Sequence, residues 1–248
     1  MATKKGDLDP LSRKKDAMAN ETILVVEDDD SILELISFHL SKEGFTVQQT
    51  LTGEEALERA SAMRPDLILL DLMLPKMSGL EVCVKLKEDV VTHGIPVIIV
   101  SARGVDRDVI AGLEAGADDY ITKPFRPATL IADVRAMLCR VARGRVDAGQ
   151  DLVFAELQMS PDKREVQVAG RPVTVTDVEF QVLHYLGLHC GQIRTRAQIR
   201  AALGVDEEDA LGFSVDDLVV SLSKKLGDSG RYVEAVRRIG FRFKDSPS

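Results

Sequence analysis

Between residues 20 and 143, short apolar runs alternate with longer stretches in which apolar residues recur every three or four positions. The apolar runs are 23–26 (ILVV), 45–50 (FTVQQT), 66–72 (DLILLDL), 96–102 (PVIIVSA) and 118–125 (DDYITKPF). Each run is short enough for one β-strand, and each is followed by the spacing of an amphipathic helix. Strands that alternate with helices are typical of βαβ units. We therefore predict an α/β domain over 20–143, built on a doubly wound parallel sheet with helices on both faces.

The pattern stops near residue 144 and resumes differently. The segment 144–150 is rich in Arg, Gly and small residues and is predicted to be a linker. Beyond it, 151–248 contains alternating short runs at 152–159, 165–170 and 171–175, helical patterns near 176–189, 195–203 and 214–226, and two terminal strand-like runs at 231–236 and 240–243. This order predicts a small α+β domain. Residues 1–19 are polar and predict a disordered tail, and Met18 is an alternative translation start.

The composition narrows the class of protein. No apolar run approaches the roughly 20 residues that span a bilayer, so we expect no membrane segment. The three cysteines are odd in number and far apart, which favours reduced thiols in a cytoplasmic protein over a disulfide framework or a zinc site. The net charge is −8, so any nucleic-acid contact must come from the local placement of basic residues.

Charged and hydroxyl side chains follow four of the predicted strands. The acidic run 27–30 follows the first, Asp71 the third, Ser101 the fourth and Lys123 the fifth. Ligands of doubly wound sheets bind at the carboxyl ends of strands. Clustered carboxylates repel each other unless a cation lies among them, and their oxygen ligands suit Mg²⁺. A carboxylate beside Mg²⁺, a lysine and a hydroxyl predicts phosphoryl transfer. Helix capping is the alternative for the acidic run and for Asp71 taken singly.

The motifs VVEDD, LLDLMLPKMSG, PVIIVSA and GADDYITKPF resemble the receiver domain of response regulators, a flavodoxin-like (βα)5 fold, over 22–142. The resemblance implies that Asp71 accepts a phosphoryl group from a sensor histidine kinase. It also implies these roles: an acidic pocket of Glu27 and Asp28; a Mg²⁺ site of Asp28, Asp71 and the backbone carbonyl of Met73; phosphate binding by Ser101 and Lys123; an aromatic switch at Tyr120; and a cis bond before Pro124.

Two positions beside the acceptor bear on how long the phosphoryl group lasts. Met73 and Ala102 both leave access to the phosphoryl group, and neither supplies a base that activates water. We therefore expect slow dephosphorylation, with the chain assisting its own phosphorylation rather than acting as an enzyme on other substrates. Packing of Met73 against its own loop is the alternative.

The segments 173–199 and 214–243 resemble the winged-helix output domain of the OmpR/PhoB family. The resemblance implies a transcription regulator that binds duplex DNA, with the helix at 214–226 in the major groove and the terminal hairpin as a wing. The candidate DNA contacts are Arg194, Arg196, Ser214, Ser221, Lys224, Lys225, Arg237, Arg238 and Arg242. The chain departs from the family at several of these positions. It has Phe213 and Arg238 where the family usually has Arg and Gly, and it adds an acidic residue, Asp217. It also has Leu218, Ser221 and Ser223 where the family usually has basic or hydrogen-bonding residues.

These departures leave a second interpretation of the output domain. Leu211, Phe213 and Leu218 can form an apolar face for protein contact in place of specific DNA reading, and core packing is the alternative for them. The resemblance also implies a phosphorylation-promoted homodimer that uses Asp118 and Asp119. Asp133 stands at a position that is usually basic, while Arg135 and Arg140 remain, so the ion pairs of such a dimer are expected to differ.

Two rival classes are weaker for the first domain. Haloacid-dehalogenase-type phosphatases also use an Asp nucleophile with Mg²⁺, but they carry D-x-D after the first strand, whereas Asp71 follows the third. A receiver that is never phosphorylated is disfavoured, because every residue of the acceptor site is present.

Overall fold

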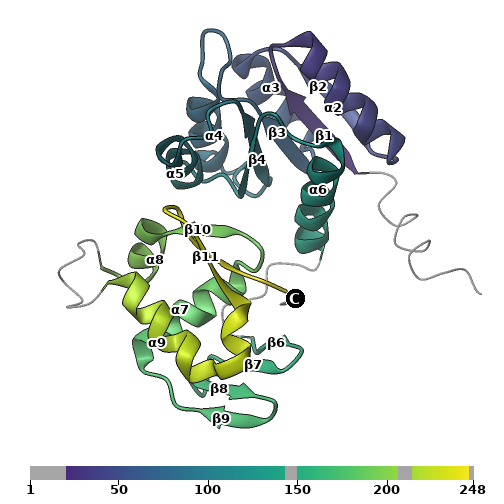
Figure 1. Ribbon diagram of the computed structural model, residues 1–248. Helices are drawn as coiled ribbons and strands as arrows, with labels where there is room; N and C mark the ends of the chain where they lie inside the picture. The colour runs from purple at the N-terminus through teal and green to yellow at the C-terminus, as the bar shows by residue number, and fades with distance from the viewer. Residues whose placement is uncertain (1–20, 143–149, 206–213, 246–248) are drawn as a thin grey trace, which may run out of the picture. The chain divides into compact units, whose positions relative to one another are not determined.

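The computed structural model describes residues 21–142, 150–205 and 214–245, except for the side chains of Arg140 and Ala142 (Figure 1). The predicted tail 1–19, most of the predicted linker, Leu211 and Phe213 lie outside the described residues. Residues 21–142 and 150–245 carry separate sheets and separate cores, and each part is treated by itself.

The first part contains the predicted five-stranded sheet. Its strands are β1 (Thr22–Val26), β2 (Thr46–Thr50), β3 (Leu67–Leu70), β4 (Val97–Ser101) and β5 (Asp119–Thr122). Their order is β2-β1-β3-β4-β5, and the pairs from β2 to β4 are parallel. The chain order reverses at the β1/β3 pair, and the carboxyl side of such a pair is where doubly wound sheets bind ligands.

The helices that alternate with these strands along the chain are α2 (Asp30–Lys42), α3 (Gly53–Met63), α4 (Gly79–Glu88), α5 (Asp106–Glu114) and α6 (Pro127–Ala142). Side-chain caps begin three of them, from Asp29, Thr52 and Ser78. The buried faces of α2 and α6 pack with β1, β3 and β4 in one apolar cluster. Helices α3 and α4 pack against each other on the opposite face of the sheet (Figure 1). The predicted α/β architecture is confirmed.

The second part opens with an antiparallel four-stranded sheet of β6 (Leu152–Phe154), β7 (Leu157–Ser160), β8 (Glu165–Val168) and β9 (Arg171–Val173). The helices follow at α7 (Asp177–Leu188), α8 (Arg196–Ala202) and α9 (Val215–Leu226), close to the predicted ranges. A second sheet joins β10 (Ile193–Thr195) to the terminal hairpin of β11 (Val233–Val236) and β12 (Gly240–Phe243). This is the predicted α+β domain.

Two details of the second part differ from the sequence prediction. Residues 193–195 pair with β12 although no strand was predicted there, because three residues are too few to show alternation. Residues 227–232, whose end was assigned to a strand, form the 3-10 helix η2 (Gly227–Tyr232).

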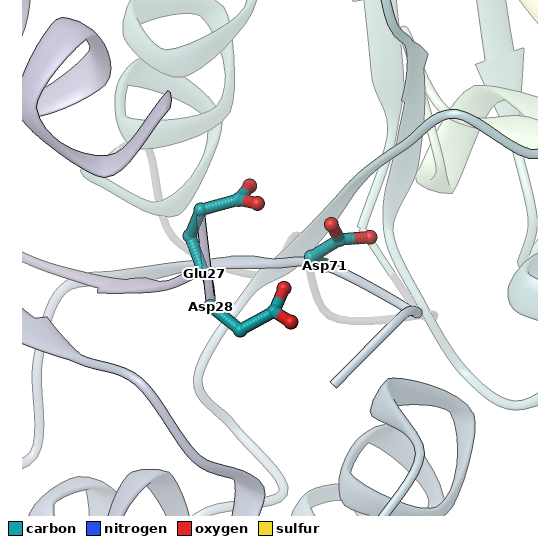
Figure 2. A group of neighbouring side chains, drawn as sticks. All are labelled: Glu27, Asp28 and Asp71. Atoms are coloured by element: carbon teal, nitrogen blue, oxygen red, sulfur yellow. The ribbon is translucent and has the colours of Figure 1, made fainter. Parts of the chain in front are cut away.

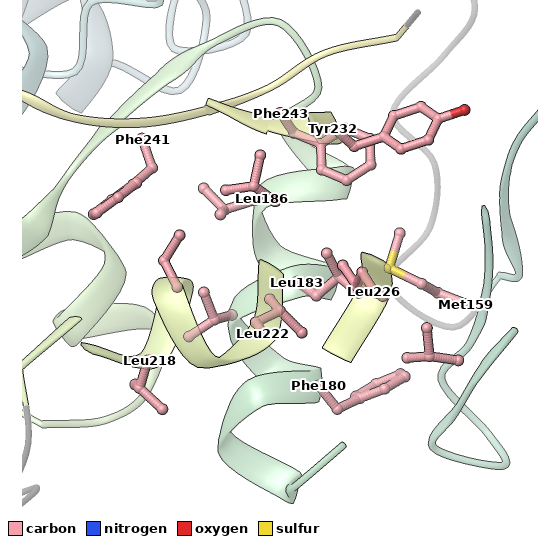
Figure 3. Close-up of a cluster of buried hydrophobic side chains, with 14 of the residues drawn as sticks. Met159, Phe180, Leu183, Leu186, Leu218, Leu222, Leu226, Tyr232, Phe241 and Phe243 are labelled. Carbon is pink, nitrogen blue, oxygen red and sulfur yellow. The ribbon is translucent and has the colours of Figure 1, made fainter. Parts of the chain in front are cut away.

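One apolar core unites the helices and strands of the second part (Figure 3). Phe180, Leu183 and Leu186 of α7 pack with the buried face of α9 and with Phe243 of β12. Leu218 and Leu222 of α9 belong to this core. In the described parts of the chain, no helix combines the length and apolarity needed to cross a bilayer.

Candidate functional site

The pairing of β1 with β3 brings the acidic residues together. Val26 stands opposite Leu70, so the next residues, Glu27 and Asp71, lie side by side. The backbone amide of Asp71 donates to the carbonyl of Val26 at 2.9 Å, which continues the strand pairing into the site. Both carboxylates are nearly inaccessible, at 2 % and 4 % exposed. Two adjacent buried carboxylates require a compensating positive charge.

Asp28 completes a group of three carboxylates (Figure 2). One ligand oxygen from each of Glu27, Asp28 and Asp71 lies within 4.8 Å of the others, and Asp28 is exposed. Asp29 instead caps α2 by accepting from the amides of Ser31 and Ile32. Capping is therefore correct for Asp29, whereas Glu27 and Asp28 belong to a group of carboxylates that is compatible with a divalent metal ion.

Lys123 supplies one positive charge to this group. Its Nζ donates to Glu27 Oε2 and to Asp71 Oδ2, each at 2.6 Å. Three carboxylates against one ammonium leave negative charge in a site that is largely buried. Oxygen ligands with one solvent-facing member fit a hard divalent cation such as Mg²⁺.

The two buried carboxyls differ in acidity. Burial raises the pKa of Glu27 to about 7, in spite of the Lys123 ammonium. Burial acts in the same sense on Asp71, but hydrogen bonds from Lys123 and from the Met73 amide outweigh it and hold the pKa of Asp71 below its ordinary value. Burial lowers the pKa of Lys123, but its two carboxylate partners outweigh this and raise it. Asp71 is therefore ionised at neutral pH, the state in which a carboxylate is able to act as a nucleophile.

The remaining predicted site residues line the same strand ends. Ser101, at the end of β4, is fully buried, and its hydroxyl lies close enough to bond to the Asp71 carboxyl and lower its pKa. Tyr120 of β5 is half-buried, and its hydroxyl donates to the backbone carbonyl of Arg103. The Lys123–Pro124 peptide is cis, as predicted. Met73 is 50 % exposed, and its sulfur accepts a hydrogen bond from Arg103 Nε at 3.1 Å.

Gly79 ends the LLDLMLPKMSG motif and was assigned no role from the sequence, yet it lies against Asp71. A Cβ built at Gly79 would lie 1.9 Å from the backbone oxygen of Asp71 and 2.7 Å from the Cα of Leu72. Only a residue without a side chain lets the start of α4 approach the backbone of Asp71 so closely. Residue 79 sits inside a helix-start pattern, Ser78 with Glu81, which conceals this second requirement.

The candidate DNA contacts separate into two groups. The first makes bonds inside the domain. Arg196 grips Asp216 with two bonds of 2.7 Å, Lys225 pairs with Glu179 at 2.7 Å, and Arg242 pairs with Glu234 at 2.6 Å. The others in this group are Arg194 with Gln192, Ser214 with Asp217, and Ser221 with Glu179. Neutralisation by a nearby carboxylate weakens a cation as a phosphate contact.

The second group faces solvent. Lys224 on α9 and Arg237 and Arg238 in the β11–β12 turn are exposed. Arg238 has φ = +63°, a left-handed backbone conformation that glycine adopts readily and arginine does not. The departure from the family Gly at this position therefore carries backbone strain.

Glu179, which lies within the segment 173–199, connects α7 to α9. It is 3 % exposed and accepts from the Thr176 amide at 2.7 Å, the Ser221 hydroxyl at 2.8 Å and Lys225 Nζ at 2.7 Å. The T-x-x-E pattern predicts the first bond. The contacts to α9 arise only from tertiary packing.

Comparisons with known proteins agree with this architecture. The family described as "Response regulator receiver domain" matches residues 23–135, and "Transcriptional regulatory protein, C terminal" matches 170–243. TcrX of Mycobacterium tuberculosis, a probable transcriptional regulatory protein, is 35% identical over 90% of this chain and 95% of its own length. The alkaline phosphatase synthesis transcriptional regulatory protein PhoP of Bacillus subtilis is 35% identical over 91% and 98%.

Among solved structures, the response regulator DrrB of Thermotoga maritima is similar at 32% identity and a TM-score of 0.48, over 90% of this chain and 99% of its own. The two family matches and the full-length relatives fix the class. The chain is a two-component response regulator of the OmpR/PhoB family, with a receiver domain followed by a DNA-binding output domain.

Proposed function

We propose that Asp71 accepts a phosphoryl group from the histidine of a sensor kinase and that the phosphorylated chain regulates transcription from duplex DNA. The observation that carries the first part is the side-by-side placement of Asp71 and Glu27 under Lys123. An Asp71 carboxylate oxygen forms the new P–O bond as the P–N bond of the donor breaks. The electron pair of the broken bond stays on the imidazole nitrogen.

Asp28, Asp71 and the backbone carbonyl of Met73 are the proposed Mg²⁺ ligands. When bound, the cation neutralises charge on the phosphoryl oxygens. The excess of carboxylates over ammonium in the site supports this assignment. Lys123 is placed to move from the free carboxylate to the phosphoryl oxygens as a point charge.

The proposed switch runs through Ser101 and Tyr120. A phosphoryl group adds acceptor oxygens that attract the Ser101 hydroxyl. Movement of Ser101 opens space toward which the Tyr120 ring turns, and the bond from Tyr120 to the Arg103 carbonyl breaks. Met73 and Ala102 are exposed and offer no base to water, so the phosphorylated state decays slowly.

Labelling with acetyl phosphate and Mg²⁺, read by intact mass, tests the acceptor. Wild type is expected to gain one phosphoryl group, and Asp71→Asn none. Asp66→Asn is the matched control, because Asp66 lies at the opposite end of β3 and accepts from the Thr22 amide at 2.7 Å. Equal labelling of wild type and Asp71→Asn refutes the assignment. Chelation of Mg²⁺ is expected to slow labelling of wild type.

For the output domain we propose that α9 enters the major groove and that the β11–β12 hairpin contacts the backbone. Lys224, Arg237 and Arg238 make the main phosphate contacts, while Arg196, Lys225 and Arg242 hold the domain together. The exposure of the first three and the hydrogen bonds of 2.6–2.7 Å that the other three donate to carboxylates support this division.

Protein contact by an apolar face remains the second candidate for the output domain. Burial of Leu218 in the domain core removes one of its three proposed members, and the other two lie outside the described residues.

A salt titration separates these two functions. Each phosphate contact contributes about −0.9 to the slope of log affinity against log salt. Lys224→Met is expected to flatten that slope by about one contact, and Lys225→Met to leave it unchanged. No duplex affinity even at low salt refutes the DNA-binding proposal.

We also propose that the chain acts in the cytoplasm and forms a phosphorylation-promoted homodimer. Arg135, one of the basic groups expected for the dimer, is paired with Glu43 inside the receiver. The ion pairs of the dimer must therefore draw on other residues. Sedimentation velocity with and without beryllofluoride tests this proposal, and a monomer unchanged by the phosphate mimic contradicts it.

A further inference from the structure

The outward face of α9 offers few side chains that can contact DNA. Five residues of the helix are buried: Val215, Leu218, Val219, Leu222 and Leu226. Four are exposed: Asp217, Val220, Lys224 and Lys225. The exposed positions 217, 220 and 224 are spaced three and four residues apart, so they form one stripe with Val220 at its centre.

Most polar residues of this face already have partners inside the domain. Asp217 accepts from the Ser214 hydroxyl at 2.8 Å and thereby closes the cap of α9. Lys225 is paired with Glu179, and Asp216 is held by Arg196. Lys224 and Val220 are the exposed side chains left for a ligand among the described residues of the helix.

Val220 is an exposed apolar side chain in the middle of this stripe. It is 54 % exposed in the middle of a helix, a position where burial contributes little. Valine is also a weaker helix former than alanine, lysine or glutamate because its branched side chain loses rotamer freedom. The stability of the fold would be served better by almost any long polar residue at this site.

We propose that Val220 reads thymine, by packing its two methyl groups against the thymine 5-methyl in the major groove. This inference rests on the proposed docking of α9 in that groove. Among the four bases, thymine alone presents an apolar group there. A valine has no hydrogen-bonding atoms in its side chain, so it cannot pair with a guanine or adenine edge. Lys224, one turn further along, contacts a phosphate and fixes the register of Val220 on the bases.

The proposal predicts the sequence class of the binding site. The described part of α9 presents no arginine to grip guanine, so the half-site is A·T-containing, with at least one thymine methyl under Val220. Selection from random duplexes with the acetyl-phosphate-treated full chain supplies the site. Each thymine in it is then replaced singly by deoxyuridine, which removes the methyl group and keeps every hydrogen-bonding atom.

For wild type, uracil at one or two positions is expected to weaken binding about fourfold, the ratio for loss of one buried methyl group. Val220→Ala is expected to bind the thymine and uracil duplexes equally at those positions. Val153→Ala is the matched control, because Val153 on β6 is 65 % exposed and outside α9. It should keep the wild-type dependence on thymine.

The outcomes distinguish this inference from the function on which it rests. If duplexes are selected but Val220→Ala keeps the wild-type dependence, or wild type shows none, thymine reading by Val220 is wrong while DNA binding stands. If no duplex is bound even at low salt, the docking of α9 fails and the inference falls with it.

Discussion

Replacing Lys225 by methionine tests whether this lysine is a structural tie or a DNA contact. The substitution removes the charge and keeps the aliphatic stem. A hydrogen bond to a charged group contributes about 1.5–3 kcal/mol. The Lys225 side chain is 37 % exposed, so solvent weakens the pair with Glu179. Glu179 keeps its bonds from Thr176 and Ser221. We therefore expect Lys225→Met to lower the free energy of unfolding by about 1–2 kcal/mol, which is less than the loss expected on breaking a fully buried ion pair.

Glu179→Gln provides the second arm of a double-mutant cycle. The neutral amide keeps one acceptor oxygen, and its NH₂ group faces either the Ser221 hydroxyl or the donors of Thr176 and Lys225. We expect this substitution to cost about 2–3 kcal/mol. In the double variant neither charge of the pair is left behind without its partner, so the combined cost should fall short of the sum of the single costs by about 1 kcal/mol.

Hydrogen–deuterium exchange of peptides from α9, followed in the full chain, measures these losses of stability in the helix that carries Lys225. A loss of about 1–2 kcal/mol corresponds to exchange faster by a factor of about 5–30. Lys224→Met, one residue away on the exposed face, should change exchange little. Equal exchange in the two lysine variants, or strictly additive losses in the cycle, refutes the structural assignment of Lys225.

The remaining predictions use the same full chain. The pKa of Glu179 in the folded state lies below its ordinary value of 4.5. The stability that the Glu179 carboxylate contributes is therefore complete above pH 4.5 and is lost as the pH falls through the folded-state pKa. Glu179→Gln should reduce that loss in acid denaturation curves, and an unchanged curve contradicts the assignment. Gly79→Ala should lower the free energy of unfolding by about 1–3 kcal/mol and slow acetyl-phosphate labelling, because the added Cβ meets the backbone of Asp71. Gly94→Ala is the control, since no atom lies within 4 Å of its added Cβ, and it should have neither effect. Equal behaviour of the two variants counts against the close approach of Gly79 to Asp71. Arg238→Gly should stabilise the fold by about 0–1 kcal/mol, because relief of the positive φ is partly offset by the greater entropy of the unfolded chain. The same variant should flatten the slope of log DNA affinity against log salt by about 0.9. An unchanged slope shows that Arg238 does not contact a phosphate.

The amino-acid sequence alone determined the architecture of the receiver and the identity of its site. Each buried strand is a short apolar run and each helix repeats an apolar face, so local patterning was enough to predict both. Asp71, Ser101 and Lys123 follow strands, and the parallel sheet brings the ends of its strands to one edge. That is why the sequence could identify the cluster before its geometry was known.

Tertiary structure decided what depends on contacts between distant residues. The strand register set Glu27 beside Asp71, and burial separated their acidities. The approach of α4 made Gly79 a site residue. In the output domain, the sequence identified the basic residues, but only packing showed that Lys225 turns to Glu179 while its neighbour Lys224 faces solvent. A helix advances 100° per residue, so adjacent side chains face different surroundings that composition cannot reveal.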